Sequence, residues 1–144
     1  MKKTTLALVL LASITLQAQT VYTCVVGHSY RFEGEELVYN FPPNSEDVKF
    51  QVQLTIELPH VRAIRYRISN QTISYEVNTE VPENNPYEEP NIIMGVNEPM
   101  TNHVEVIKLN TITGFMSINN LYTKKTLLGD RIDITKDEYQ CEKH

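Results

Sequence analysis

The sequence predicts an all-β protein, a small antiparallel barrel or sandwich of about 8 strands closed by a disulfide between its ends. Three observations support this fold class. Residues 48–58 alternate strictly between apolar and polar side chains, as a strand with one buried face requires. Other segments are short, β-like and bounded by turn residues, and none carries apolar residues at helical spacing for three turns. Finally, Cys24 and Cys141 lie near the two ends of the chain.

Residues 1–18 have the three parts of a secretory signal peptide. Lys2 and Lys3 give a positive start, residues 6–16 form an apolar stretch, and Ala18 is a small residue at the expected cleavage point. The apolar stretch is shorter than the roughly 20 residues that a membrane-spanning helix needs. We therefore expect residues 19–144 to form one exported domain, located in the periplasm or, alternatively, fully secreted.

The expected mature chain is acidic. Subtracting Lys2 and Lys3 from the 13 basic residues leaves 11 against 18 acidic ones, a formal charge of −7. Such a charge opposes nonspecific binding to nucleic acid or to anionic lipid and favours a basic partner, although solubility alone also explains it. We expect no nucleic-acid binding and no membrane anchor.

An even pair of cysteines in an exported protein indicates a disulfide. We therefore expect Cys24 and Cys141 to be bridged. A redox or zinc site is disfavoured, because the two cysteines show no Cys-x-x-Cys spacing. This bond would make the terminal strands neighbours. It would contribute about 4 to 5 kcal/mol in the chain-entropy model.

The first strands form a predicted meander. The strand at residues 48–58 ends at Pro59, residues 61–68 follow with a change of phase near Ala63 that indicates a β-bulge, and residues 71–79 place Ile73, Tyr75 and Val77 inward. Upstream, residues 21–26 and 37–41 are strand candidates.

A hairpin is predicted further along the chain. Residues 103–109 show a second change of phase, from Val104 and Val106 to Ile107 and Leu109, and residues 110–114 form the turn that leads to a strand at 115–119. Residues 122–128 and 131–135 are the last strand candidates, on either side of a turn at Gly129.

Residues 80–91 form a proline-rich acidic loop that cannot be a central strand. We expect it to be exposed and dispensable for folding, either as a solvated connector or as a binding surface. Tyrosine is a favoured interface residue, and Tyr87 has no core role in the pattern. The candidate partner-binding residues are therefore Tyr87, Glu83, Glu88 and Glu89.

No catalytic, metal-binding or cofactor motif is present. The sequence lacks Gly-x-Ser-x-Gly, His-Glu-x-x-His and a phosphate-binding glycine loop. The four histidines, among them His103, are scattered, and we expect them at the surface. These observations predict a protein without enzymatic activity, metal or cofactor.

A small exported β domain with one terminal disulfide and a Tyr-x-Cys near its start, here Tyr22 to Cys24, resembles in outline the periplasmic inhibitors of C-type lysozyme. The Ser-Gly-x-x-Tyr inhibitory loop of that family is not found, and the nearest string is residues 69–75. No site residues are therefore carried over. The end of the chain, with Tyr139 and Cys141, also resembles the ends of many exported bacterial proteins.

Together these features predict a periplasmic, non-enzymatic binding or interaction protein. One alternative is an inhibitor of, or an immunity protein against, a basic cell-wall hydrolase or toxin. Another is a small β-barrel that carries one apolar ligand inside.

Overall fold

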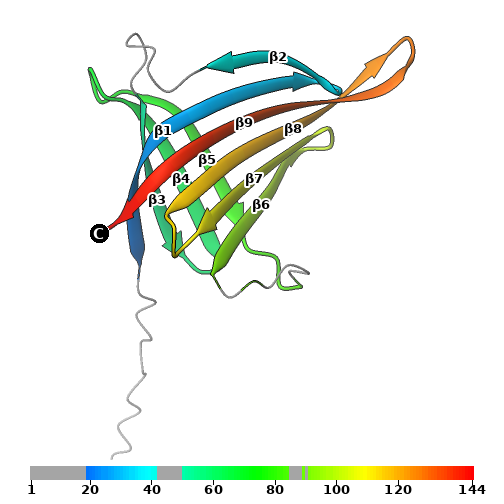
Figure 1. Ribbon diagram of the computed structural model, residues 1–144. Coiled ribbons are helices and arrows are strands. Elements are labelled where there is room, and N and C mark those ends of the chain that lie inside the picture. Colours follow the sequence, from blue (N-terminus) through cyan, green and yellow to red (C-terminus); the bar gives the residue numbers. More distant parts are fainter. Residues whose placement is uncertain (1–18, 42–49, 85–88, 90) are drawn as a thin grey trace, which may run out of the picture.

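The computed structural model describes residues 19–41, 50–84, 89 and 91–144, and the predicted signal peptide lies outside them. These residues form a closed antiparallel barrel of eight strands (Figure 1). A further strand, β2, pairs with the second half of β1. The all-β prediction is confirmed, and of its two forms the barrel is correct. The strands are β1 (Thr20–Glu33), β2 (Glu36–Phe41), β3 (Phe50–Glu57), β4 (His60–Arg67), β5 (Ile73–Glu80), β6 (Ile92–Met100), β7 (His103–Asn110), β8 (Phe115–Thr126) and β9 (Gly129–Lys143).

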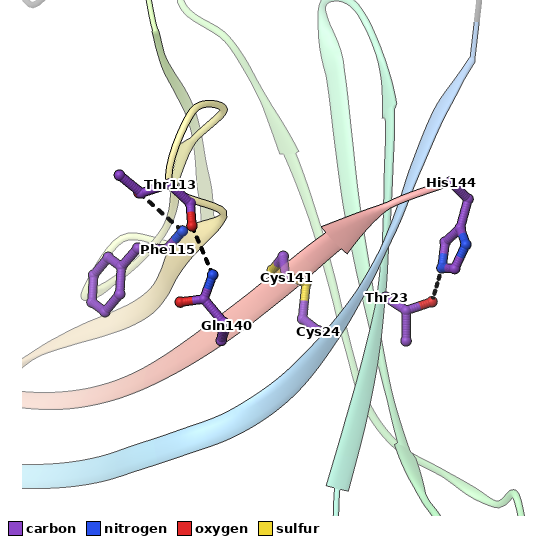
Figure 2. Close-up of a disulfide and its surroundings, with 7 residues drawn as sticks. All are labelled: Thr23, Cys24, Thr113, Phe115, Gln140, Cys141 and His144. Carbon is purple, nitrogen blue, oxygen red and sulfur yellow. Dashed lines mark hydrogen bonds between the residues drawn. A yellow bond between two sulfur atoms is a disulfide. The ribbon is translucent and has the colours of Figure 1, made fainter.

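The barrel closes between its first and last strands. β1 pairs with β9 from Tyr22↔Lys143 to Glu33↔Asp133, and the directly opposed pair Cys24 and Cys141 forms the predicted disulfide (Figure 2). Both cysteines are buried. The terminal strands are therefore neighbours, as expected from the cysteine placement.

The turn before β8 is fixed against the disulfide strand. The Cys141 amide donates to the Gly114 carbonyl at 2.8 Å. The Gln140 side-chain amide donates to the Thr113 carbonyl at 2.7 Å (Figure 2). Gly114 has a φ of 71°, and a Cβ at this position would lie 2.3 Å from the Cys141 carbonyl oxygen. This position therefore requires glycine.

Apolar side chains fill the barrel around the disulfide. They come from nearly all barrel strands, so alternation along each strand directs one set of residues into a common core. The fully buried members include Val52, Leu54, Val61, Val77, Ile107, Leu109, Met116, Ile118 and Tyr139.

An arm of strands projects beyond this core. The ladder between β7 and β8 ends at His103↔Tyr122, whereas β8 and β9 stay paired to Thr126↔Gly129 (Figure 1). The β1–β2 hairpin lies along part of the same arm. We call residues 123–132, the end of the β8–β9 hairpin, the arm tip.

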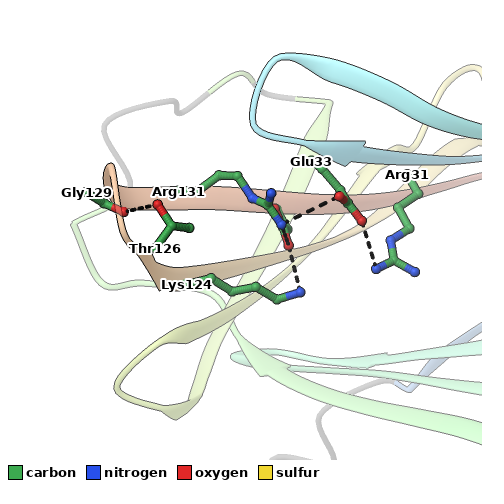
Figure 3. Close-up of polar contacts among 7 residues, drawn as sticks. Arg31, Glu33, Lys124, Thr126, Gly129 and Arg131 are labelled. Carbon is green, nitrogen blue, oxygen red and sulfur yellow. Dashed lines mark hydrogen bonds and ion pairs between the residues drawn. The ribbon is translucent and has the colours of Figure 1, made fainter.

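The base of the arm tip is held by a charge network (Figure 3). The buried carboxylate of Asp133 contacts Lys124 Nζ at 2.8 Å and Arg131 Nε at 2.8 Å. Arg131 also lies 3.6 Å from Glu33, which contacts Arg31 at 3.3 Å. Lys124 and then Arg131 hold the pKa of Asp133 below its usual value.

Several strand predictions need correction. β8 is one continuous strand from Phe115 to Thr126, where the sequence indicated two separate segments. The bulge expected near Ala63 lies instead between Arg65 and Tyr66, in the register of β4 with β5. β6 was not predicted as a strand.

Candidate functional site

The barrel wall is weakest between β5 and β6. Neighbouring strands β3 and β4 pair over their whole length, but the register between β5 and β6 consists of the single pair Glu80↔Val96. The facing edges of β5 before Glu80 and of β6 after Val96 thus have no ladder partner on this side. We call this gap the seam.

A close approach of the two strands explains why they separate on either side of the crossing. A Cβ at Gly95 would lie 2.0 Å from Thr79 Oγ1 and 3.2 Å from the Val61 Cβ. Thr79 itself is buried and donates to the Val61 carbonyl at 3.0 Å. β6 therefore passes directly over the inward face of β5 at Gly95, which a flat ladder does not allow.

The inner side of the seam is closed by a buried polar cluster. One oxygen of Glu105, on β7, lies 3.1 Å from the Tyr75 hydroxyl of β5, and its other oxygen accepts from the Asn97 amide of β6 at 3.1 Å. The Tyr75 hydroxyl is also 2.9 Å from Asn120 Oδ1, so one proton is shared between two acceptors. These side chains connect strands that the backbone ladder leaves apart.

His103 completes this cluster. Its Nε2 atom lies 3.0 Å from Asn120 Oδ1 and 3.8 Å from Glu105, and its ring stacks on Tyr122 with centroids 4.2 Å apart. His103 and Glu105 are each only 7% exposed. The expectation of a surface position for His103 is therefore wrong.

The electrostatics of the cluster favour neutral tyrosines. Burial raises the pKa of the Tyr75 hydroxyl above its ordinary value, and the negative charge of Glu105 raises it further. The same two causes, in the same order, raise the pKa of Tyr122. Tyr75 therefore remains a hydrogen-bond donor to the buried carboxylate.

Sequence reasoning missed this cluster because it placed apolar residues inward at every position. Along β7 the inward residues are His103, Glu105, Ile107 and Leu109, in one uninterrupted phase, so the change of phase expected within this strand is wrong. The available signal was the strict alternation of inward and outward positions from His103 to Leu109. Following it would have placed two polar residues, His103 and Glu105, inside the barrel.

The outer side of the seam forms an acidic groove. Two adjoining pockets of about 550 Å³ and 490 Å³ share the residues Glu80, Val96, Asn97 and Glu98. We call their combined surface the seam groove, and its charged lining consists of Glu57, His60, Arg62, Glu80, Glu83 and Glu98.

Part of this negative charge is not neutralised. His60 lies 3.2 Å from Glu80, and Arg62 pairs at 2.8 Å with Glu76 and thereby lowers the pKa of that carboxyl. Within the part of the chain that the structure describes, Glu57, Glu83 and Glu98 form no ion pair. The groove is thus suited to a cationic ligand.

The predicted loop residues lie only partly within view of the structure. Glu83 is exposed and lines the seam groove, and Glu89 is exposed and accepts from the Ile92 amide through its carbonyl at 3.0 Å. Tyr87 and Glu88 lie outside the described residues. Their role in partner binding stays a prediction.

Comparison of the chain with protein-family models, with curated proteins and with solved structures gave no match. In the described ranges, no cluster of side chains suited to holding a metal ion is found. Those ranges also contain no helix long and apolar enough to cross a membrane.

Proposed function

We propose that this protein is an exported, non-enzymatic binding protein that holds an extended basic segment of a partner protein in the seam groove. The observation that carries the proposal is the reduction of the β5–β6 ladder to the single pair Glu80↔Val96, at a position lined by carboxylates. The unpaired strand edges and the carboxylates without ion pairs can then both contact a partner.

Unpaired strand edges bind extended chains. Backbone N–H and C=O groups at such an edge are satisfied when a partner strand adds to the sheet. Residues of both edges, Asn78 and Thr79 on β5 and Asn97 and Glu98 on β6, line the same pocket. A segment lying in this pocket can reach either edge.

Charge gives the partner its chemistry. The groove carboxylates without ion pairs, together with a mature charge of −7, attract lysine and arginine side chains and repel acidic segments. Since side chains alternate along a strand, a segment with a basic residue at every second position would direct all its charges to one side. Such complementarity raises association rates more than it raises final affinity.

The inner cluster limits how deep a partner reaches. Tyr75 and Asn97 each donate a hydrogen bond to Glu105 across the seam, so the barrel interior is closed behind the groove. A partner protein would therefore bind at the outer surface of the barrel and would not enter its interior. Inhibition of, or immunity to, a basic cell-wall hydrolase or toxin is the sharper form of the proposal.

The test compares two charge-reversed proteins. Glu80→Lys with Glu98→Lys changes the groove, and Glu35→Lys with Glu36→Lys changes two exposed carboxylates on the β1–β2 hairpin by the same charge. Each protein is immobilised and exposed to periplasmic extract at low and at high salt. We expect the wild type and the hairpin variant to retain the same basic protein, and the groove variant to lose at least roughly tenfold in affinity.

Hydrogen exchange then locates the bound segment. On addition of the purified partner, the backbone amides of β5 and of residues 96–100 are expected to exchange more slowly, because strand addition satisfies their edges. Retention of no partner under either salt condition would contradict the function. Equal retention by both variants would place the binding site elsewhere.

A carrier of an apolar ligand is the second candidate function. It is favoured by a pocket of about 600 Å³ at the barrel mouth near the chain ends, lined partly by Tyr22, Ile56, Leu58 and Ile93. Native mass spectrometry of protein purified from its host would show a bound ligand as added mass, and an unliganded mass would count against a carrier.

A further inference from the structure

Part of the inner surface of the barrel is polar, although the core around the disulfide is apolar. Arg65, on β4, pairs at 3.2 Å with Asp137, on β9, and these two strands are not neighbours in the sheet. The ion pair therefore crosses the interior, and the Asp137 side chain faces inward. The Ser29 hydroxyl of β1, directly opposite Asp137 in the ladder, donates to the other carboxylate oxygen.

The polar inner surface continues along the arm. Side chains two positions apart lie on the same face of a strand. Arg31 therefore faces inward with Ser29, and on β9 the same holds for Asp133 and Asp137. Tyr122 of β8 lies directly opposite Asp133. We call the inward-facing residues within 29–33, 120–124 and 131–137 the polar wall.

Solvent reaches the polar wall. The side chains of Arg31 and Lys124 are each 50% exposed, although they lie on the inward face. Tyr122 is half-buried, with its ring stacked on His103. The exposed fractions show that side chains of the facing strands do not fill the space in front of these groups. A small molecule can therefore contact the wall from inside the arm.

The charges of the polar wall neutralise one another (Figure 3). Glu33 lies between Arg31 and Arg131 and contacts both. Asp133 pairs with Lys124 and Arg131 in the same way. A charged ligand would have to draw one partner of such a pair away from its counter-charge, which is costly for a buried carboxylate. The wall is therefore suited to a polar ligand without net charge.

Stability alone does not require a polar surface here, because ion pairs shielded from water often contribute no more than apolar packing does. The Tyr139 hydroxyl, between the wall and the disulfide, is a second observation. Only 1% of Tyr139 is exposed, and its hydroxyl has no hydrogen-bond partner within the described residues. Burial, followed by the charge of Asp137, raises the pKa of this hydroxyl, so it remains a donor. One buried donor beside the wall is thus left for a ligand.

We propose that the polar wall binds a neutral saccharide. Each hydroxyl group of a sugar can accept one hydrogen bond and donate another. A guanidinium group beside a carboxylate, as in Arg131 with Asp133, presents the matching donor and acceptor. The exposed part of the Tyr122 ring offers an apolar surface for the C–H face of a sugar ring. This site is separate from the seam groove and does not depend on the function proposed there.

A saccharide fits the polar wall better than an extended peptide does. From Asp133 to Asp137 the backbone of β9 is paired on both sides, with β1 and with β8. The centre of the wall therefore has no open strand edge to which a peptide could add. Recognition has to come from side chains, and the carboxylates, guanidinium groups and tyrosine ring of the wall match hydroxyl groups and a sugar ring.

A glycan array that carries neutral and acidic oligosaccharides tests the ligand class. We expect the protein to retain at least one neutral oligosaccharide, whose dissociation constant is then measured by isothermal titration calorimetry. Because the ligand has no charge, this constant should change by less than about twofold between low and high salt. A strong weakening by salt would mean that a charged ligand is bound, against the proposal.

Two cations of β9 form a matched pair of variants. Arg131 and Lys136 are both 38% exposed and both pair with a carboxylate of β9, but they lie on opposite faces of the strand. Arg131→Gln should weaken saccharide binding roughly tenfold, whereas Lys136→Gln should leave it unchanged. Arg31→Gln, at a half-exposed position, is a second wall variant with the same expected loss. Thermal denaturation checks that each variant is folded.

An NMR titration with the retained oligosaccharide locates the site. We expect the Nε–H signals of Arg31 and Arg131 to shift, and that of Arg62, in the seam groove, to stay in place. Retention of no neutral oligosaccharide, or of acidic ones only, overturns the proposal. So does an equal loss of affinity in Arg131→Gln and Lys136→Gln, or a shift confined to Arg62, since either would place the saccharide outside the polar wall.

Discussion

The Tyr75 hydroxyl lies 3.1 Å from a carboxylate oxygen of Glu105 and so joins β5 to β7 at the place where β5 and β6 are not paired. Glu105 also accepts from Asn97 on β6. The barrel is therefore closed at the seam by side chains where the other neighbouring strands use backbone ladders.

Removal of this hydroxyl should destabilise the protein. Tyr75→Phe leaves the buried Glu105 with one donor fewer, which is expected to lower the free energy of unfolding by roughly 1 to 3 kcal/mol in urea denaturation. Tyr66→Phe is the control, because within the described residues the half-buried Tyr66 hydroxyl makes no hydrogen bond. An equal effect of both substitutions would mean that the loss comes from hydroxyl removal in general.

Two tyrosines should ionise later than the others in an alkaline titration. Burial is the first cause that raises the pKa of both Tyr75 and Tyr139, followed by the charges of Glu105 and Asp137 respectively. We expect the absorbance of phenolate at 295 nm to show a delayed phase, above the ordinary value of about 10, that becomes smaller in Tyr75→Phe. A titration with no delayed phase would contradict the burial of these hydroxyls.

The same shift fixes the sign of the pH dependence of stability. Because the folded-state pKa is raised, the contribution of Tyr75 is fully present below the unfolded value of about 10 and is lost as the pH rises through the folded value. Unfolding free energies measured on either side of pH 10 should therefore fall with pH, and more steeply for the wild type than for Tyr75→Phe.

Gly95→Ala should be strongly destabilising for its size. The added methyl group would lie 2.0 Å from Thr79 Oγ1, and we expect a loss of about 1 to 3 kcal/mol or more from overpacking. Gly27→Ala on β1 is the matched control, because its Cβ would lie 3.4 Å from the nearest atom, the Glu138 carbonyl oxygen. Thr79→Ala in the Gly95→Ala background should recover part of the loss. Thermal denaturation in which both glycine variants melt alike would contradict the close crossing at the seam.

Loss of the disulfide should affect global stability. The bond joins residues 117 positions apart, so Cys24→Ala with Cys141→Ala is expected to cost about 4 to 5 kcal/mol in the chain-entropy model. Guanidinium unfolding of the double variant and of the oxidised wild type measures this difference. A variant as stable as the wild type would indicate that the β1–β9 ladder already restricts the ends without the bond.

Patterns of alternation and cysteine placement were sufficient to predict the all-β class, the closed barrel as one of two forms, and the disulfide. β6 was missed because Gly95 and Pro99 argue against a central strand. In the structure, Gly95 is needed at the crossing, and Pro99 lies where the register with β7 shifts and a backbone donor is not required.

The seam groove could be predicted from sequence only as a local excess of acidic residues. Glu83 was singled out, but Glu57 and Glu98 come from other strands, and only the fold brings them to one groove. Not all of residues 80–91 can be expected to be dispensable for folding. Val81 packs against the core, and its amide donates to the Pro59 carbonyl at 2.8 Å.

The pairing of β1 with β9 also governs when the barrel can form. The partner of the first strand is the last one to be synthesised, so β1 must wait for the whole remaining chain before its ladder with β9 can start. Contacts at such large sequence separation slow folding, because most of the chain loses entropy before they form. The closed barrel therefore cannot form until β9 is accessible, and the earlier strands need protection from aggregation until then.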